Sequence, residues 1–230
     1  MNLSISMRLV ILLAAAVLLM APAMASAETV ADKEPAPTLT LIGHASVKIK
    51  TAEGIVIYID PYQPGDYSEK ADIILVSHEH SDHNKVSLCQ QNEGCLVLRA
   101  KDAINSKDMS YNTFEHLGVT IEPVPAANKN HSIKSSVGFV LAFDGFTVYH
   151  AGDTSRLDQM AVLMEKNIDY ALFPIDGMYN MGAQEAMECA LVVGAKHNTP
   201  IHYFNADPAA FQPENLLSIG YGETVELEKE

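Results

Sequence analysis

Basic side chains are scarce in this 230-residue sequence. Lysine and arginine together number 15 against 29 aspartates and glutamates, which gives a formal net charge of -14 with neutral histidines. A protein that binds nucleic acid or an anionic membrane surface needs a basic footprint to meet the phosphate groups. We therefore expect neither nucleic acid nor an anionic membrane surface among its partners.

Cysteine is also scarce, with three residues in the whole chain. Cys89 and Cys95 flank the turn-like stretch QQNEG, where a disulfide would close a small loop. Two buried reduced thiols explain the same residues equally well. Cys189 lies inside a helical pattern, and none of the three cysteines suits a catalytic role.

A long apolar run is missing outside the N-terminus. The run LVILLAAAVLLM at 9–20 is short for a membrane span, follows Arg8 and precedes the small residues ASA at 25–27. This order is typical of a signal peptide cleaved after Ala27 or after Ala25. We therefore expect residues 1–27 to be removed and the mature chain to be periplasmic or extracellular, without stable membrane insertion. A retained N-terminal anchor is the alternative.

The rest of the chain indicates one domain. Residues 28–37 are polar and proline-rich and predict a flexible leader, whereas short apolar runs from residue 38 onward predict strands of a domain over 38–230. The pair DG at 144–145 separates two such runs and predicts a hairpin. Helical patterns cover 156–167 and 183–195. The first of these has an apolar stripe made by Leu157, Met160, Leu163 and Met164.

The stretch VSHEHSDHN at 76–84 holds three histidines and an aspartate directly behind an apolar run. On extended backbone His78 and His80 reach a common point, whereas Asp82 and His83 can serve a second one. Imidazole and carboxylate are ligands for zinc, iron or manganese, and the absence of a nearby cysteine argues against a structural zinc finger. A histidine-rich loop without a ligand role is the alternative, but its rings would be poorly satisfied beside a buried strand.

Two metal ions need more ligands than this stretch supplies. His131 in a polar loop, Asp153 after a glycine in HAGDT, and His202 in PIHY follow it in order. Each is a weak candidate alone, because a lone histidine is commonly a surface or core residue and an aspartate after glycine is commonly a turn residue.

Taken together, SHEHSDH, the downstream histidine, HAGDT and PIHY resemble the metallo-β-lactamase superfamily of hydrolases. The segments LIGHASVKI at 41–49 and PIDGMYNMG at 174–182 are similar to those of the branch that contains ascorbate-6-phosphate lactonase and related metal-dependent hydrolases. The resemblance spans residue 38 to about residue 205. It implies a four-layer αββα sandwich of the α/β class, with metals at the edge where two sheets meet.

The resemblance also implies a ligand set for two divalent ions, zinc first, with manganese or iron as alternatives. One ion would be held by His78, His80 and His131, the other by Asp82, His83 and His202, and Asp153 would bridge them. The implied activity is attack of a metal-bound hydroxide on a lactone, another ester or a phosphodiester, with Asp82 orienting the nucleophile or accepting its proton. The partner would be a small-molecule substrate. The alternatives are an exported metal-binding protein of the same fold without turnover, and a β-lactam hydrolase.

Five further residues are expected near the site. His44 in GHAS would approach it, or be a hydrogen-bonded structural histidine; Asp60 would orient a ligand or cap a turn; and His150 would support the site or the core. Asp176 and Tyr179 belong to the segment at 174–182. Asp176, Asn180 and Ala183 depart from the branch pattern of glycine, threonine and proline. We expect the Asp176 carboxylate to lie beside the pocket and to repel anionic substrates.

Overall fold

A computed structural model describes residues 35–62 and 64–229 of the chain. The predicted signal peptide and most of the predicted leader lie outside the described residues. Residues 35–37 have no regular structure, and the first strand begins at Thr38. Within the described ranges, no helix is both long enough and apolar enough to cross a membrane.

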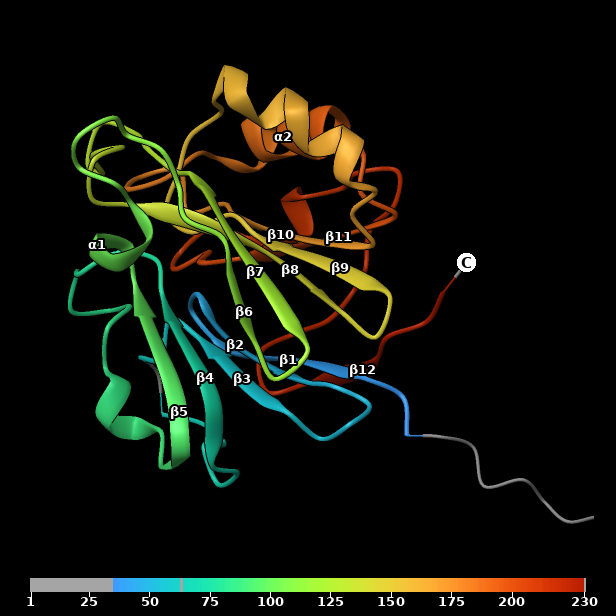
Figure 1. The fold of residues 1–230 in the computed structure, drawn as a ribbon. Helices are drawn as coiled ribbons and strands as arrows, with labels where there is room; N and C mark the ends of the chain where they lie inside the picture. Colours follow the sequence, from blue (N-terminus) through green and yellow to red (C-terminus); the bar gives the residue numbers. More distant parts are fainter. Residues whose placement is uncertain (1–34, 63, 230) are drawn as a thin grey trace, which may run out of the picture. The chain divides into compact units, whose positions relative to one another are not determined.

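Two six-stranded mixed sheets form the body of residues 35–229 (Figure 1). The first has the order β12-β1-β2-β3-β4-β5 and the second the order β11-β10-β9-β8-β7-β6. The strands of the first sheet are β1 (Thr38–Gly43), β2 (Ser46–Lys50), β3 (Val56–Ile59), β4 (Ala71–Val76), β5 (Gln91–Arg99) and β12 (Thr224–Glu226). Those of the second are β6 (Phe114–His116), β7 (Val119–Pro125), β8 (Val137–Phe143), β9 (Phe146–His150), β10 (Tyr170–Pro174) and β11 (His197–Ile201).

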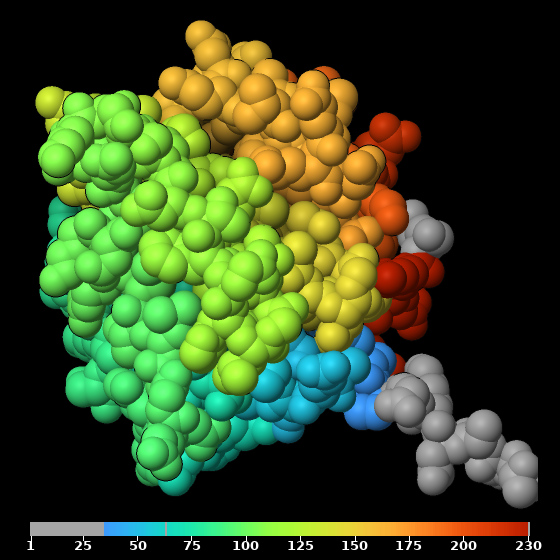
Figure 2. All heavy atoms as spheres, viewed as in Figure 1, coloured from blue at the N-terminus to red at the C-terminus, as the bar shows by residue number. Residues whose placement is uncertain are grey.

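The helical elements are few and mostly short. They are α1 (Ala100–Ala103), α2 (Ala183–Val193) and the 3-10 helices η1 (Val86–Leu88), η2 (Asp158–Lys166) and η3 (Pro208–Ala210). In Figure 1, α2 lies over the face of the second sheet that points away from the first sheet. In Figure 2, light-orange atoms in the colour of η2 lie above the yellow-green strands.

The main core lies between the two sheets. Fully buried side chains such as Ile49 of β2 and Phe139 of β8 belong to one apolar cluster. A second cluster, with Tyr149 and Phe173, lies between the second sheet and η2 with α2. The outer face of the first sheet carries a smaller cluster, against which Tyr67 and η1 pack. The predicted α/β sandwich is therefore confirmed, although loops and a 3-10 turn form most of the outer layer on the first sheet.

The hairpin at 144–145 is confirmed. Strands β8 and β9 are antiparallel on either side of it. Asp144 and Gly145 have φ values of 49° and 75°, as a two-residue turn between twisted strands requires.

The helix predicted over 156–167 is instead the 3-10 helix η2. With three residues per turn, Leu157, Met160 and Leu163 share one face, and the last two are buried. Met164 leaves that stripe and is 56% exposed. An α-helical period would have kept it on the buried face.

The turn predicted at QQNEG is a bulge inside strand β5. Gln91 pairs with Ala71 and Leu96 pairs with Ile73, so that β5 advances five residues while β4 advances two. Gly94, with φ of 80°, lies in this irregular stretch. All three cysteines are free thiols in the structure, which agrees with the reduced alternative for Cys89 and Cys95.

Candidate metal centre

The site lies where strands of both sheets end together. Strands β9, β10 and β11 are parallel neighbours. They are followed by Asp153, Asp176 and His202 respectively. Because the carboxyl ends of parallel strands meet at one sheet edge, these three side chains are brought to the same place although they are far apart in sequence.

The first sheet contributes in the same way. Strands β1, β3 and β4 run in one direction. They are followed by His44, Asp60 and the loop that starts at Ser77. Backbone bonds join the two sheets at this edge, from Val137 N–H to Ser77 O at 2.9 Å and from His202 N–H to His44 O at 2.8 Å.

Three of these residues have strained backbone. His44, Asp60 and His202 come directly after a strand and have φ values of 56°, 47° and 46°. A left-handed conformation costs a non-glycine residue about 1–2 kcal/mol. Such strain is concentrated at functional sites, where surrounding contacts hold the backbone in place.

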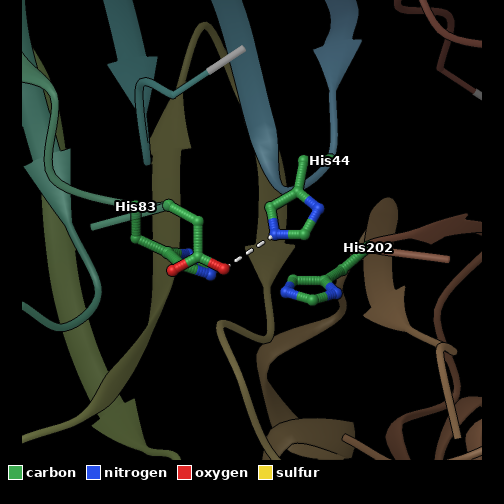
Figure 3. A group of neighbouring side chains, drawn as sticks. His44, His83 and His202 are labelled. Atoms are coloured by element: carbon green, nitrogen blue, oxygen red, sulfur yellow. Dashed lines mark hydrogen bonds and ion pairs between the residues drawn. The ribbon is translucent and has the colours of Figure 1, made fainter. Parts of the chain in front are cut away.

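The predicted ligand side chains converge in three overlapping groups, and the ligand atoms of each group lie within 4.8 Å of one another. The first group is His78, His80 and His131; the second is His78, His83 and Asp153; the third is His44, Asp82, His83 and His202. Figure 3 shows His44, His83 and His202 side by side, with a dashed line for the 3.2 Å contact between His44 Nε2 and Asp82 Oδ2. We expected His44 to approach the site, and its ring centroid lies 3.6 Å from that of His202.

Asp153 lies between the two predicted ligand sets, which we call half-sites. The first half-site is His78, His80 and His131, and the second is Asp82, His83 and His202. Its Oδ2 atom is 3.3 Å from His131 Nε2, 3.5 Å from His83 Nε2 and 3.4 Å from His202 Nε2. One carboxylate oxygen therefore faces a histidine of the first half-site and two histidines of the second. That is the geometry a bridging ligand needs.

Four buried polar atoms at the centre have no hydrogen-bond partner among the described residues. They are Nε2 of His78, His83 and His202 and Oδ1 of Asp153. Buried polar atoms are rarely left unsatisfied, and an unpaired group costs about 1–3 kcal/mol. The donor set is imidazole and carboxylate, so that divalent cations fit these atoms.

The other ring nitrogen of most of these histidines faces a polar partner. His83 Nδ1 lies 2.8 Å from Asp60 Oδ2, His78 Nδ1 lies 3.0 Å from Ser77 Oγ, and His131 Nδ1 lies 2.9 Å from Asn128 Oδ1. Asp60 also accepts the N–H and the hydroxyl of Ser77. Each partner accepts a hydrogen bond from Nδ1, so Nε2 is the nitrogen that faces a metal ion.

Ser77 and Asn128 were not predicted from the sequence as residues of the site. Asn128 stands three residues before His131, a spacing at which an asparagine side chain commonly caps a turn, and that signal was available. No comparable signal marks Ser77.

Burial and charge set the ionisation of the ligands. Burial lowers the pKa of His78 to about 3, with the charge of His83 as a further cause, and burial lowers the pKa of His131. Both rings are thus neutral at pH 7, the form that binds metal. The contact with His44 holds the pKa of Asp82 below its usual range, so its carboxylate is ionised.

His83 behaves in the opposite way. Burial disfavours its charged form, but Asp153 and Asp60 raise its pKa well above the usual value. The pKa values of both carboxylates are lowered in turn, against the effect of burial. Without a metal ion, both ring nitrogens of His83 are therefore protonated at pH 7. A cation that binds Nε2 must displace the proton on that atom.

His150 and Asp176 do not reach the centre. His150 Nε2 donates to Ala45 O at 2.9 Å, and its Nδ1 accepts the N–H of Gly152, so the ring fixes the turn that carries Asp153. Asp176 lies beside the cleft, next to His202, but is not among the residues that line it. Its side chain is 1% exposed and lies 3.0 Å from Nδ1 of His202, because backbone N–H groups of its own loop draw it inward.

An open cleft of about 540 Å³ lies over these atoms. Two of its lining residues are Tyr179, which is 51% exposed, and Asp82, which is half-buried. The lining residues are Glu79, His80, Ser81, Asp82, Asn130, His131, Asp153, Tyr179 and His202. A small molecule in this cleft would touch both predicted half-sites.

Comparisons with known proteins show the family of this chain. The family model for the β-lactamase superfamily domain matches residues 38–202. A UPF0173 metal-dependent hydrolase of Pyrococcus furiosus is 32% identical over 206 residues, which cover 79% of this chain and 91% of that protein. A second one, from Methanoregula boonei, is 33% identical over 183 residues, covering 72% of this chain and 81% of the relative.

Solved structures give the same result. A chain of Parabacteroides distasonis assigned as a metal-dependent hydrolase superimposes with a TM-score of 0.68 at 29% identity, covering 76% of this chain and 86% of that one. A chain of Thermotoga maritima assigned as a zinc-dependent hydrolase superimposes with a TM-score of 0.58 at 28% identity, covering 79% and 81%. This chain belongs to the β-lactamase superfamily and is a metal-dependent hydrolase similar to the UPF0173 proteins.

Proposed function

We propose that this hydrolase cleaves an uncharged lactone or other carboxylic ester with two divalent ions. His78, His80 and His131 would hold one ion, Asp82, His83 and His202 would hold the other, and Asp153 would serve both. The observation that carries the proposal is the approach of Asp153 Oδ2 to histidines of both ligand sets, among buried nitrogens that have no hydrogen-bond partner in the described residues.

Two bound divalent ions polarise a substrate carbonyl and lower the pKa of water enough to supply a nucleophile at neutral pH. The protein supplies orientation. Asp82 is the carboxylate with the greatest access to the cleft among the ligands, and it directs the attacking oxygen toward the substrate. The contact from His44 keeps the Asp82 side chain in that position.

The charge of the cleft favours an uncharged substrate. Glu79, Asp82 and Asp153 line it, and no lysine or arginine is among its lining residues in the described chain. Arg99 stands near, but its guanidinium donates to Glu79 at 2.9 and 3.1 Å. A phosphate monoester would therefore bring anionic oxygens that no cationic side chain meets, whereas an ester carbonyl needs none.

We further propose zinc as the native metal, with manganese or iron as the other outcomes of elemental analysis, because the ligand set suits all three. The mature chain is proposed to be periplasmic or extracellular, from the pattern of residues 1–27. Sequencing the N-terminus of protein purified from its native host tests this, since cleavage gives Glu28 or Ser26 as the first residue and a retained anchor gives neither.

Turnover by the metal-loaded protein tests the function. Uncharged aryl esters and lactones should be hydrolysed faster than a phosphodiester, a phosphate monoester or a β-lactam. Asp82→Ala should lower kcat by at least about 100-fold, because a positioned carboxylate in proton transfer contributes at least that much. Its near-ultraviolet circular dichroism should be unchanged.

Asp66→Asn is the matched control, because Asp66 is an exposed carboxylate that pairs with Lys48 away from the cleft. It should retain full activity. Two bound ions without turnover of any ester would identify a metal-binding protein instead. A faster rate with β-lactams would identify a β-lactam hydrolase.

A further inference from the structure

The loop after β10 is built around one buried carboxylate. Oδ1 of Asp176 accepts the backbone N–H groups of Met178, Tyr179 and Asn180 at 2.7, 2.6 and 3.2 Å. Its side chain is almost fully buried. Three bonds from successive residues hold the carboxylate in a single orientation.

The second oxygen of this carboxylate faces two side chains. Oδ2 accepts the Asn180 amide N–H at 2.9 Å and lies 3.0 Å from Nδ1 of His202. Despite this distance, Nδ1 of His202 makes no hydrogen bond among the described residues. Burial opposes the charge of Asp176, but the His202 contact and the backbone N–H groups keep its pKa below the usual range.

The Asn180 amide connects Asp176 to the half-site that contains His131. Asn180 is buried, and its Oδ1 accepts an N–H from the Asn128 amide at 3.0 Å. Asn128 Oδ1 then accepts from Nδ1 of His131 at 2.9 Å. A continuous path of polar contacts thus runs from His202 to His131.

We propose that Asp176, Asn180 and Asn128 act as positioning residues. Together they fix the ring orientation of one histidine in each half-site, His202 and His131. We call these three residues the polar chain. The inference rests on the proposed function for the part that concerns metal binding. The polar chain lies outside the ligand set and contacts one histidine of each group.

Donor and acceptor chemistry fixes which way each side-chain amide of the polar chain points. The carboxylate only accepts, so Asn180 must turn its NH₂ group toward Asp176 and its oxygen toward Asn128. Asn128 must then present its NH₂ group to Asn180 and its oxygen to His131. Both histidines consequently carry their proton on Nδ1, which leaves the lone pairs of both Nε2 atoms for a metal ion.

Asn180→Ala tests the polar chain, because it removes the middle link and touches neither histidine. We expect this variant to weaken the binding of both ions, each by about tenfold, the lower end of the effect of outer partners of metal ligands. Asp176→Asn keeps an oxygen for the loop N–H groups but turns an NH₂ group toward His202. It should weaken mainly the ion held by His202, by roughly 10- to 100-fold. Competition titration with a chromophoric zinc chelator measures both affinities.

A second readout needs no metal. In metal-free protein with ¹⁵N-labelled histidine, nuclear magnetic resonance should assign the Nδ1–H tautomer to His131 and to His202. Asn180→Ala should shift the ring signals of both, and Asp176→Asn should move His202 toward the Nε2–H tautomer. Asn215→Ala is the control, because it removes an asparagine bond to Ala195 O beside the start of β11.

The outcomes separate the two proposals. Two ions in the wild-type protein, with affinities and ring signals that Asn180→Ala leaves unchanged, would overturn the polar chain and leave the function intact. No bound ion in the wild type would overturn the function, while coupled tautomer shifts in the variants would still support the polar chain. Equal effects of Asn215→Ala would overturn it.

Discussion

Asp60 Oδ2 lies 2.8 Å from Nδ1 of His83, and both side chains are completely buried. The same carboxylate accepts the N–H and the hydroxyl of Ser77, the residue directly before the histidine motif. A buried carboxylate thus anchors the start of the loop and one of its proposed ligands. We therefore expect Asp60 to contribute both to folding and to metal binding.

We expect Asp60→Asn to lower the free energy of unfolding by about 3–5 kcal/mol, because removing one partner of a buried ion pair leaves the other uncompensated. The affinity for the ion held by His83 should fall by roughly 10- to 100-fold. Urea unfolding of the metal-free protein and zinc titration measure the two effects. Asp66→Asn, at an exposed pair with Lys48, should change stability by less than about 1 kcal/mol. Equal losses in both variants would contradict the role of Asp60.

The metal-free protein should be most stable near pH 6.5, the unperturbed pKa of histidine. Below that pH the unfolded chain protonates His78, His131 and His150, whose pKa values are lowered in the fold. The unfolded state then binds more protons, and stability falls as the pH falls. Above that pH folded His83 keeps a proton that the unfolded chain has lost, so stability also falls as the pH rises.

Urea unfolding with excess chelator at pH 5, 6.5 and 8 checks this dependence. The free energy of unfolding should be highest at pH 6.5. With metal bound, the proton on His83 is displaced, so the decrease between pH 6.5 and 8 should disappear. A steady rise from pH 5 to 8 in the metal-free protein would contradict the charged state of His83.

Gly152→Ala should destabilise the fold and displace Asp153. Gly152 has φ of 64°, and a Cβ atom there would lie 2.5 Å from Val137 O. The left-handed backbone costs about 1–2 kcal/mol, and the clash adds roughly 1–3 kcal/mol. Gly118→Ala is matched to it, because φ is 76° and a Cβ atom would meet nothing within 4 Å. Thermal unfolding should show the larger loss for Gly152→Ala, and equal losses would exclude the close approach.

Tyr179→Ala should raise KM for aromatic esters by roughly 2- to 10-fold, because contact between aromatic groups contributes about 0.5–1.5 kcal/mol beyond buried area. The kcat value should be unchanged, since the ring touches no predicted ligand side chain in the described structure. Met178→Ala is the control, because Met178 is the adjacent residue, is similarly exposed and is absent from the cleft lining. Steady-state kinetics of both variants measures the difference. Equal KM values would exclude a role of Tyr179 in substrate binding.

The candidate metal ligands were easier to predict from the sequence than the residues and strands that hold them in place. A histidine and aspartate cluster behind a buried strand is a local pattern, and Asp153 and His202 follow strands whose apolar runs are easily recognised. Their convergence depends on the parallel order of β9, β10 and β11, which no local pattern contains. Only the family resemblance implied it.

The errors have local physical causes. Periodicity alone does not distinguish the 3-10 helix η2 from an α-helix over nine residues, since the stripe differs at Met164 alone. The polar stretch at 90–94 looks like a turn, but a neighbouring strand holds it in a bulge. Nothing in the sequence shows that three backbone N–H groups of its own loop hold the Asp176 carboxylate inward, out of the cleft lining.

Anomalous diffraction from crystals of the zinc- or manganese-loaded protein tests the central claim most directly. We predict two peaks about 3.5–4 Å apart, one surrounded by His78, His80 and His131 and the other by Asp82, His83 and His202, with Asp153 between them. No peak among these side chains at saturating metal, or one ion bound elsewhere in the chain, would contradict the account.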